Sequence, residues 1–335
     1  MARVTLKQVA IHSGVSYQTV SEVVKGSDKV APETRKRVQA ALDTLDYHPS
    51  HAARSMRLSK SMNIAYVVYR IEDFTDSAMG ENLSGMLEVL DAAGYSLTIE
   101  AHRGGLERIR ASLGQGKIDG AILASLPHET LPETLSHWGH PLVAFDQPDH
   151  IGGIGVVRAD YRGGVAQAVQ HLFERGRRNI AFIGGPPDYE LPLWHNTERH
   201  AGFQQGMGQV GLGILAEQVI HSDYSVAGGR AAMCELFGRG STLDAVVCAS
   251  DRMALGAAQE IKSRGLNIPR DFAVTGFNDS EFAQIVDPPL TTVRFPIREM
   301  GLRAATLLLE KILDQGALAR EHLVIPLPLI VRGSS

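Results

Sequence analysis

One stretch near the N-terminus decides the fold of that region: Thr5-Leu6-Lys7-Gln8-Val9-Ala10, then Ser13-Gly14-Val15, then Ser16-Tyr17-Gln18-Thr19-Val20-Ser21-Glu22-Val23-Val24. Leu6, Val9 and Ala10 recur at i, i+3 and i+4, which places them on one face of a first helix. Gly14 permits the tight turn that a larger residue would resist. The pattern predicts two short helices joined by a tight turn, a helix-turn-helix.

The ends of both helices carry capping signals. Thr5 and Gln8 have the spacing of a capping box, and Ser16 is a good N-cap for the second helix. Val20, Val23 and Val24 are then expected to face inward. The residues left exposed at the start of the second helix, where a recognition helix meets base edges, are Tyr17, Gln18, Ser21 and Glu22. From this pattern alone, two helices of an ordinary α-helical domain remain an alternative.

The first 60 residues are basic, whereas the remainder of the chain is acidic. Residues 1–60 contain ten Lys and Arg residues against five Asp and Glu residues, a net charge of +5. The whole chain holds 33 Lys and Arg against 37 Asp and Glu, net −4, so residues 61–335 carry −9. This asymmetry is expected where only the N-terminal segment contacts phosphates. The acidic body also disfavours wrong docking on DNA.

Composition and length are typical of a soluble globular protein with two or three domains. The chain has 335 residues, of which 44% are hydrophobic and 21% charged. No apolar run reaches the roughly 18 residues that span a bilayer, and Met1–Gln8 has no apolar secretory region. Cys234 and Cys248, the two cysteines, form neither a CxxC motif nor a disulfide framework. These features predict a protein of a reducing cytoplasm.

A third helix and a hinge are expected next. Pro32-Glu33-Thr34 places a proline in a first helical turn, and the helix is predicted to end before Tyr47-His48-Pro49. Its apolar face consists of Val38, Ala41, Leu42 and Leu45. Residues 50–58 are rich in Ala and Arg and too short to remain helical alone in water. We interpret this segment as a hinge that becomes ordered only when something supports it.

From Met62 onward, apolar strands alternate with helical stretches. Strands are expected at 64–69, 96–100, 121–126, 142–146, 153–157, 180–184, 219–221, 245–249 and 273–276. Helices are expected up to 94 and at 106–113, 163–174, 199–210, 227–237, 253–264 and 298–313, with apolar segments at 323–325 and 329–331. Such alternation predicts parallel sheets covered on both faces. Because it occurs in two runs, two similar α/β lobes are expected.

Residues 4–57 closely resemble the lactose-repressor family of bacterial transcription regulators. The matching motifs there are Val4–Ala10, Ser13–Ser21, Thr34-Arg35-Lys36-Arg37-Val38 and Leu45-Asp46-Tyr47-His48-Pro49. The resemblance continues over nearly all the chain, with motifs in the family's order and spacing. They are Ile183-Gly184-Gly185-Pro186, Arg199-His200-Ala201-Gly202-Phe203, Ala249–Gly256, Gly276-Phe277-Asn278-Asp279 and Pro289-Leu290-Thr291-Thr292-Val293.

The resemblance implies an N-terminal all-α helix-turn-helix DNA-binding domain and an α/β core of two lobes, like the periplasmic sugar-binding proteins. The implied divisions are a headpiece at 1–49, a hinge helix and linker at 50–61, an N-terminal lobe at 62–158 plus 293–318, and a C-terminal lobe at 159–292 plus 319–335. The chain would cross between the lobes near residues 159, 291 and 318. The resemblance also implies a homodimer on a two-fold symmetric DNA operator.

Two kinds of DNA contact are expected. Tyr17, Gln18 and Glu22 are predicted to read base edges, because Gln can pair with adenine and Glu can accept from the cytosine amino group. Phosphate contacts are expected from Ser16, Thr19, Ser21, Lys29 and Thr34. The further candidate contacts are Thr5 and, in the hinge, Ala53, Arg54 and Met56. Two hinge helices would lie in the minor groove, with Met56 wedged between base steps and Arg54 and Arg57 near phosphates.

An effector site is expected between the lobes, since polar side chains follow the ends of several predicted strands, where ligands bind in open α/β sheets. The candidates are Asp146, Trp194, Arg199, Tyr224, Asp251 and Asn278. Carboxylates, an amide and an arginine suit vicinal hydroxyls, and Trp194 or Tyr224 can stack on a sugar ring. For Asp251 and Asn278 the alternative is helix capping and turn formation. For Arg199 it is a surface salt bridge.

Three positions depart from the family's usual residues: Glu22 where Arg is common, Met56 where Leu is usual, and Asn278 where Asp is frequent. The first leaves the operator sequence open and the third leaves the effector open. The expected effector is a sugar or sugar derivative.

Enzyme motifs are weak by comparison. Gly153-Ile154-Gly155 begins a dinucleotide fingerprint, but Arg158 replaces its third glycine. There is no P-loop or GxSxG elbow, and neither His137/His140 nor His195/His200 has a zinc spacing. We therefore expect a repressor without cofactor or metal. The alternative is a transport-type or enzymatic sugar-binding protein with an incidental helical bundle.

Overall fold

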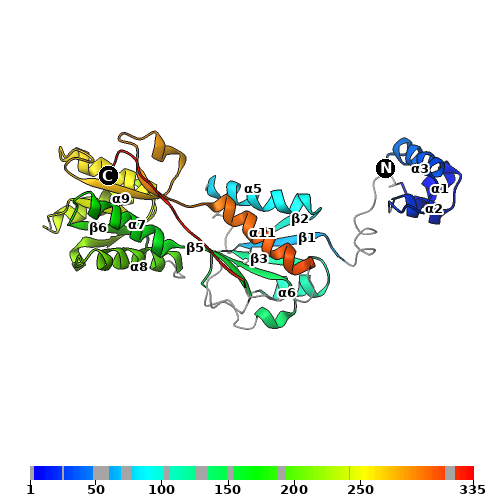
Figure 1. The fold of residues 1–335 in the computed structure, drawn as a ribbon, viewed down its shortest axis with the longest axis horizontal. Helices are drawn as coiled ribbons and strands as arrows, with labels where there is room; N and C mark the ends of the chain where they lie inside the picture. Colours follow the sequence, from blue (N-terminus) through cyan, green and yellow to red (C-terminus); the bar gives the residue numbers. More distant parts are fainter. Residues whose placement is uncertain are drawn as a thin grey trace. The chain divides into compact units, whose positions relative to one another are not determined.

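The computed structural model describes residues 4–24, 26–47, 60–68, 77–101, 106–124, 135–148, 154–186, 194–240, 242–313 and 321–335. The chain divides into two compact units, Met1–Met62 and Asn63–Ser335. The expected hinge contacts Ala53, Arg54 and Met56 lie outside the described residues. The two units are described separately below, and Figure 1 shows the order of their elements along the chain.

The described part of the N-terminal unit contains three helices. Its helices are α1 (Leu6–Ser13), α2 (Tyr17–Val24) and α3 (Pro32–Thr44). The predicted capping box is present: the Gln8 N–H donates to Thr5 Oγ1 (3.4 Å) and the Thr5 N–H to Gln8 Oε1 (2.8 Å). Gly14 ends α1 with φ 64°, a left-handed conformation that favours glycine. The buried core shared by the helices consists of Val9, Ala10, Val20, Val23, Val38, Ala41 and Leu42.

The second unit contains two six-stranded sheets, one per lobe. The first sheet has the order β11-β5-β4-β3-β1-β2, and all its pairs are parallel. Its strands are β1 (Asn63–Val68), β2 (Ser96–Ala101), β3 (Gly120–Ala124), β4 (Leu142–Phe145), β5 (Gly155–Ala159) and β11 (His322–Ile325).

The second sheet has the order β12-β10-β9-β8-β6-β7. Its strands are β6 (Ile180–Gly184), β7 (Val219–His221), β8 (Ala245–Cys248), β9 (Ala273–Asn278), β10 (Thr291–Arg294) and β12 (Leu329–Ile330). All pairs are parallel except β10 with β12, which is antiparallel. Two predominantly parallel α/β lobes are therefore confirmed.

Helices cover both faces of each sheet. In the first lobe, α5 (Ser77–Ala92) packs on α11 (Ile297–Leu313), and Asn82 of α5 bonds the Tyr66 hydroxyl of β1. The alternate β1 residues Ala65 and Val67 instead pack on α6 (Glu107–Gly114), so α6 covers the other face.

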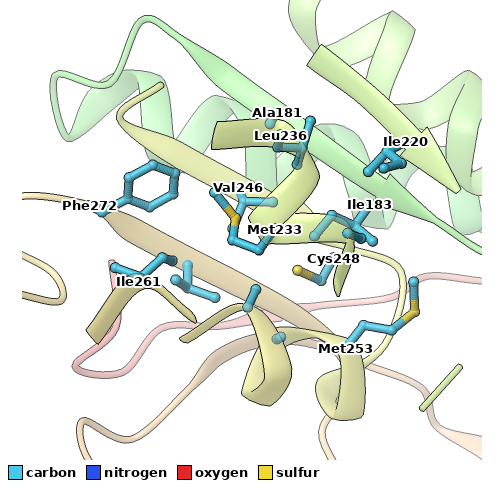
Figure 2. Packing of buried hydrophobic residues seen from close by; sticks show 14 of the residues in the cluster. Ala181, Ile183, Ile220, Met233, Leu236, Val246, Cys248, Met253, Ile261 and Phe272 are labelled. Carbon is cyan, nitrogen blue, oxygen red and sulfur yellow. The ribbon is translucent and has the colours of Figure 1, made fainter. Parts of the chain in front are cut away.

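In the second lobe, α7 (Tyr161–Glu174) packs on α8 (Trp194–Gln209), and α9 (Val226–Gly238) on α10 (Asp251–Ser263). Figure 2 shows Met233 of α9 and Ile261 of α10 in one buried cluster with Val246 and Cys248 of β8. Short 3₁₀ turns complete the structure at η3 (Leu135–Trp138), η4 (Ala216–Gln218) and η5 (Glu281–Gln284).

The boundaries of the lobes differ from two expectations. β10 pairs with β9 through Arg294, so residues 293 and 294 belong to the second lobe. β11 pairs with β5, so residues 322–325 belong to the first lobe, and the last crossover follows Ile325 and not residue 318. The expectation failed because an apolar run identifies a strand but not the sheet edge that accepts it.

No helix among the described residues is long and apolar enough to span a membrane.

Candidate functional site

The first candidate surface is the start of α2. Tyr17 has 51% of its surface exposed, Gln18 is exposed, and Ser21 and Glu22 are half-buried. Ser16 caps the helix as predicted, since its Oγ accepts from the Thr19 N–H at 3.1 Å. The Ser16 and Thr19 hydroxyls also bond each other at 2.9 Å. This surface is polar and aromatic, and it is held in place by the valine core beneath α2.

The other expected DNA-contact residues of the headpiece lie on neighbouring elements. Thr5 and Lys29 are exposed and Thr34 is half-buried. Two basic residues of α3 instead support the turns: Arg35 donates to the Ser27 carbonyl at 2.5 Å and Arg37 to that of Gly14 at 3.4 Å.

The second candidate site is an interlobe cluster, defined here as Asp146, Tyr161, Trp194, Arg199, Tyr224 and Phe277. Asp146 follows β4 in the first lobe. The other five residues belong to the second lobe, on α7, α8, the turn before α9, and β9. All of them lie at or beyond the carboxyl ends of parallel strands, as expected for a ligand site.

Asp146 is the first-lobe member of the cluster and joins the two lobes. Its Oδ2 accepts from the Tyr161 hydroxyl at 2.6 Å, and its carbonyl oxygen accepts from Trp194 Nε1 at 2.6 Å. Its backbone is left-handed, with φ 53°. Burial raises the pKa of the Asp146 carboxyl, while the Tyr161 hydrogen bond and the Arg199 charge act in the opposite direction.

Arg199 is 6% exposed and is surrounded by aromatic rings. Its guanidinium carbon lies 4.3 Å from the Phe277 ring centre, 4.9 Å from that of Tyr161 and 5.9 Å from that of Tyr224. One nitrogen donates to the Tyr224 hydroxyl at 3.1 Å, and the Tyr224 hydroxyl donates to Asn196 Oδ1. Nε is buried without a hydrogen-bond partner among the described residues. The surface salt bridge considered for Arg199 is therefore not what the structure contains.

Trp194, expected to stack on a ligand, contacts Tyr161 and Arg158 in the structure. Its ring lies 5.7 Å from that of Tyr161 in a T-shaped arrangement, and the Arg158 guanidinium lies 5.7 Å from its centre. The imidazole ring of His195, the next residue, lies 5.9 Å from the Tyr161 ring and is tilted by 36° to it. Burial, reinforced by Arg199, lowers the pKa of His195 to about 3, so its imidazole is neutral at physiological pH.

Asp251 and Asn278 differ from each other in their surroundings. Asp251 is 1% exposed and accepts from the Ser280 N–H (2.7 Å), the Ser280 hydroxyl (2.6 Å) and the Thr292 hydroxyl (2.5 Å). Both of its oxygens are thus occupied by the protein, and Ser250 is the N-cap of α10. Asn278 is exposed, with φ 109°, directly after Phe277 of the cluster.

Sequence reasoning missed Tyr161 and Phe277 as site residues. The sequence did offer a reason to consider Phe277, because it lies within the Gly276-Phe277-Asn278-Asp279 motif of the family resemblance. For Tyr161 the sequence offered no reason beyond its place after a predicted strand.

Among the described residues, no group of three or more His, Cys, Asp or Glu side chains could hold a metal ion.

Taken together, a helix-turn-helix domain and a two-lobed α/β core with polar and aromatic residues between its lobes define a ligand-binding regulator class. Comparisons with known proteins agree with this class. Residues 5–50 match the family model for bacterial regulatory proteins of the lacI family, and residues 169–335 match a periplasmic binding protein-like domain.

Curated relatives extend over the whole chain. The transcriptional regulator CelR of Thermobifida fusca is 34% identical, covering 99% of this chain and 98% of its own length. The repressor CytR of Escherichia coli K12 is 31% identical, covering 99% and 96%. The chain therefore belongs to the lacI family, and it is a helix-turn-helix transcriptional regulator and not an enzyme.

Solved structures show the same architecture. A CelR–cellobiose complex aligns with a TM-score of 0.71 at 33% identity, over 99% of this chain and all of that one. A lac repressor dimer bound to operator and an anti-inducer aligns with a TM-score of 0.84 at 25% identity, over 99% of both chains.

Proposed function

We propose that this protein represses genes of sugar metabolism by binding a two-fold symmetric operator as a homodimer, with a sugar or sugar derivative bound between its lobes. The observation that carries the proposal is the interlobe cluster, in which Arg199 and Asp146 meet aromatic rings in a chain that also has an exposed recognition-helix start. Its place of action is the operator DNA of the bacterial cytoplasm and nucleoid.

In the DNA-binding part of the proposal, Tyr17, Gln18 and Glu22 read bases in the major groove. The phosphate contacts come from Thr5, Ser16, Thr19, Ser21, Lys29 and Thr34. The hinge at 50–61 supplies Ala53, Arg54 and Met56 to the minor groove at the operator centre. The exposure of Tyr17 and Gln18 at the N-terminus of α2 supports the first of these roles.

In the effector part, the cluster supplies the groups that sugars require. Arginine and carboxylate side chains bond hydroxyls, and aromatic faces stack on the apolar face of a sugar ring. Arg199 Nε is a donor that the described residues leave unpartnered, and Asp146 Oδ1 receives only a 3.5 Å contact from the Ala159 N–H. The cellobiose complex of the related CelR supports the same ligand class. Asn278 borders the cluster as a further contact, and no cofactor is required.

The homodimer is supported by an apolar groove on the second lobe. The groove has a volume of about 190 Å³ and lies between α10 and the segment after η5; its lining includes Leu255, Ala258, Phe282, Val286 and Leu290. Ile285, next to the lining residue Val286, is 79% exposed. An exposed apolar side chain beside an apolar groove on one face suits a two-fold contact between copies. The related lac repressor is a dimer in its operator complex.

The proposal is tested with the full-length protein in two steps. Selection from random duplexes should return a palindromic site whose affinity falls steeply with salt. A thermal-shift screen of sugars, with nucleosides as comparison, should then find a ligand that raises the melting temperature and changes operator affinity.

Two variants make the second step specific. Arg199→Ala should remove the effector response and keep operator binding, whereas Arg270→Ala, whose partner is the adjacent Asp271 on the surface, should preserve both. Selection of no symmetric site, or a full effector response in Arg199→Ala, would contradict the proposal.

A further inference from the structure

Tyr161 occupies the first crossover between the lobes and contacts both of them. It is the first residue of α7, directly after the chain leaves β5, and only 3% of its surface is exposed. Its ring stacks on two phenylalanine rings, Phe277 of β9 at 5.8 Å and Phe295, directly after β10, at 5.7 Å, with interplanar angles of 20° and 21°. The ring is therefore fixed in the second lobe.

The hydroxyl of the same side chain reaches the first lobe. It donates to Asp146 Oδ2 at 2.6 Å, the short distance typical of a hydroxyl bonded to an ionised carboxylate. Asp146 has a left-handed backbone with φ 53°, a conformation that is uncommon for residues other than glycine and that aspartate adopts more readily than most. Trp194 Nε1 bonds the Asp146 carbonyl oxygen, and the Asp146 N–H donates to the Val157 carbonyl of β5 at 2.7 Å, so Asp146 is held from both lobes.

The ring of Tyr161 also positions the main second-lobe donor. Arg199 lies 4.9 Å above this ring, and its one hydrogen bond to another described residue is the bond to Tyr224. With so few hydrogen bonds, the guanidinium is located mainly by the aromatic faces around it. A movement of Tyr161 would therefore move Arg199 as well as release Asp146.

We propose that Tyr161 is a positioning residue that couples effector occupancy to the arrangement of the two lobes, because one side chain holds both Asp146 and Arg199. Tyr161 engages Oδ2 of Asp146 and leaves Oδ1, with its single 3.5 Å contact, to accept from an effector hydroxyl. An effector that bonds both Asp146 Oδ1 and Arg199 then acts on both lobes, because Tyr161 already links Asp146 of the first lobe to Arg199 of the second. The coupling role rests on the proposed effector site between the lobes.

The first test needs no ligand. In a Trp138→Phe background, Trp194 is the remaining tryptophan of the two, so acrylamide quenching reports its accessibility at the lobe boundary. Tyr161→Phe removes only the hydroxyl and should raise the quenching constant by about twofold, since the lobes would open more often. Tyr66→Phe is the matched control, because its buried hydroxyl bonds Asn82 within one lobe. Its quenching constant should equal that of the parent.

Asp146→Asn provides a second route to the same interaction if Tyr161→Phe does not fold. It keeps an acceptor for the Tyr161 hydroxyl but removes the charge, and should give an intermediate quenching constant. A Tyr161→Phe protein whose Trp194 is quenched no more than the parent's would overturn the proposal, as would an equal increase in Tyr66→Phe.

The second test uses cellobiose, the sugar in the complex of the related CelR. The ratio of cellobiose affinities with and without operator should exceed about fivefold in the parent and approach one in Tyr161→Phe. An unchanged ratio in Tyr161→Phe would contradict the coupling role. If the parent does not bind cellobiose, the sugar class of the proposed function is in question, while the quenching experiment still decides the role of Tyr161.

Discussion

Thr292 on β10 donates a hydrogen bond of 2.5 Å to the carboxylate of Asp251, the first residue of α10. The two residues are 41 positions apart in the chain, and both are fully buried. The same carboxylate also bonds the backbone and hydroxyl of Ser280. Asp251 thus ties α10 to β10 and to Ser280 in the segment after β9, whose last residue is Asn278.

We predict that Asp251→Asn destabilises the core. The amide keeps one acceptor oxygen, but its NH₂ group would face a hydrogen-bond donor in a buried site. The free energy of unfolding should fall by about 2–4 kcal/mol in urea denaturation. Asp223→Asn is the control, because Asp223 is exposed and, among the described residues, bonds the nearby Ser225 alone. A stable Asp251→Asn protein that has lost effector binding would instead support direct ligand contact.

A second prediction concerns Gly185, which lies against the cluster. A Cβ atom at this position would come within 2.2 Å of the Tyr224 hydroxyl oxygen and 2.8 Å of Asn196 Oδ1. Gly185→Ala should therefore displace Tyr224 from Asn196 and Arg199 and weaken effector binding by about tenfold, as measured by calorimetry. Gly208→Ala in α8, where a Cβ meets nothing within 4 Å, should leave affinity unchanged and slightly raise stability.

The periodic features of the sequence predicted most of the fold. The Thr5–Gln8 capping box, the Ser16 cap and the alternation of strands with helices all depend on neighbours close in sequence. β10 was not expected as a strand, and β11 was assigned to the wrong lobe, because each pairs with a strand distant in sequence. Short segments at sheet edges have too little periodicity to reveal such partners.

The sequence predicted where the candidate site residues lie along the sheet but not which residues they contact. The strand-end argument placed Asp146, Arg199 and Tyr224 at one carboxyl edge, and in the structure they lie in one cluster with Trp194. The sequence could not show that Asp251 is occupied by Ser280 and Thr292, because those hydrogen bonds depend on tertiary packing. For the same reason it could not show that Tyr161 crosses the lobe boundary.

The third prediction is a pH dependence of stability from His195. Its pKa is about 3 in the folded protein and about 6.5 in an unfolded chain. Between these values the unfolded state binds a proton that the native state excludes. The free energy of unfolding is therefore unaffected by His195 above pH 6.5. Below that pH it falls, by up to about 1.4 kcal/mol per pH unit. Urea denaturation between pH 5 and 7 should show a shallower dependence for His195→Asn, and coincident slopes would refute this role.

The fourth prediction tests the proposed dimer face. Ile285→Asp places a charge where the second copy would bury an isoleucine, so the dimer dissociation constant should rise more than about a hundredfold. Analytical ultracentrifugation measures this change. Leu215→Asp is the matched control, because Leu215 is another exposed apolar residue of the second lobe, at 55%, and lies before η4. If both variants remain dimeric, the dimer uses another face.

The last prediction concerns operator choice by Glu22. This residue lies on α2, one helical turn after Gln18, and is half-buried. A carboxylate can accept from the cytosine amino group, whereas an arginine donates to guanine O6 and N7. Glu22→Arg should therefore change the preferred base at one position of each half-site in a selection from random duplexes, and discriminate there by about 1–3 kcal/mol. Lys29→Ala should behave differently, weakening all sequences alike and reducing the salt slope by about one. If Glu22→Arg instead selects the parent's site and only binds it more tightly, residue 22 acts through its charge near the phosphates and not by reading a base.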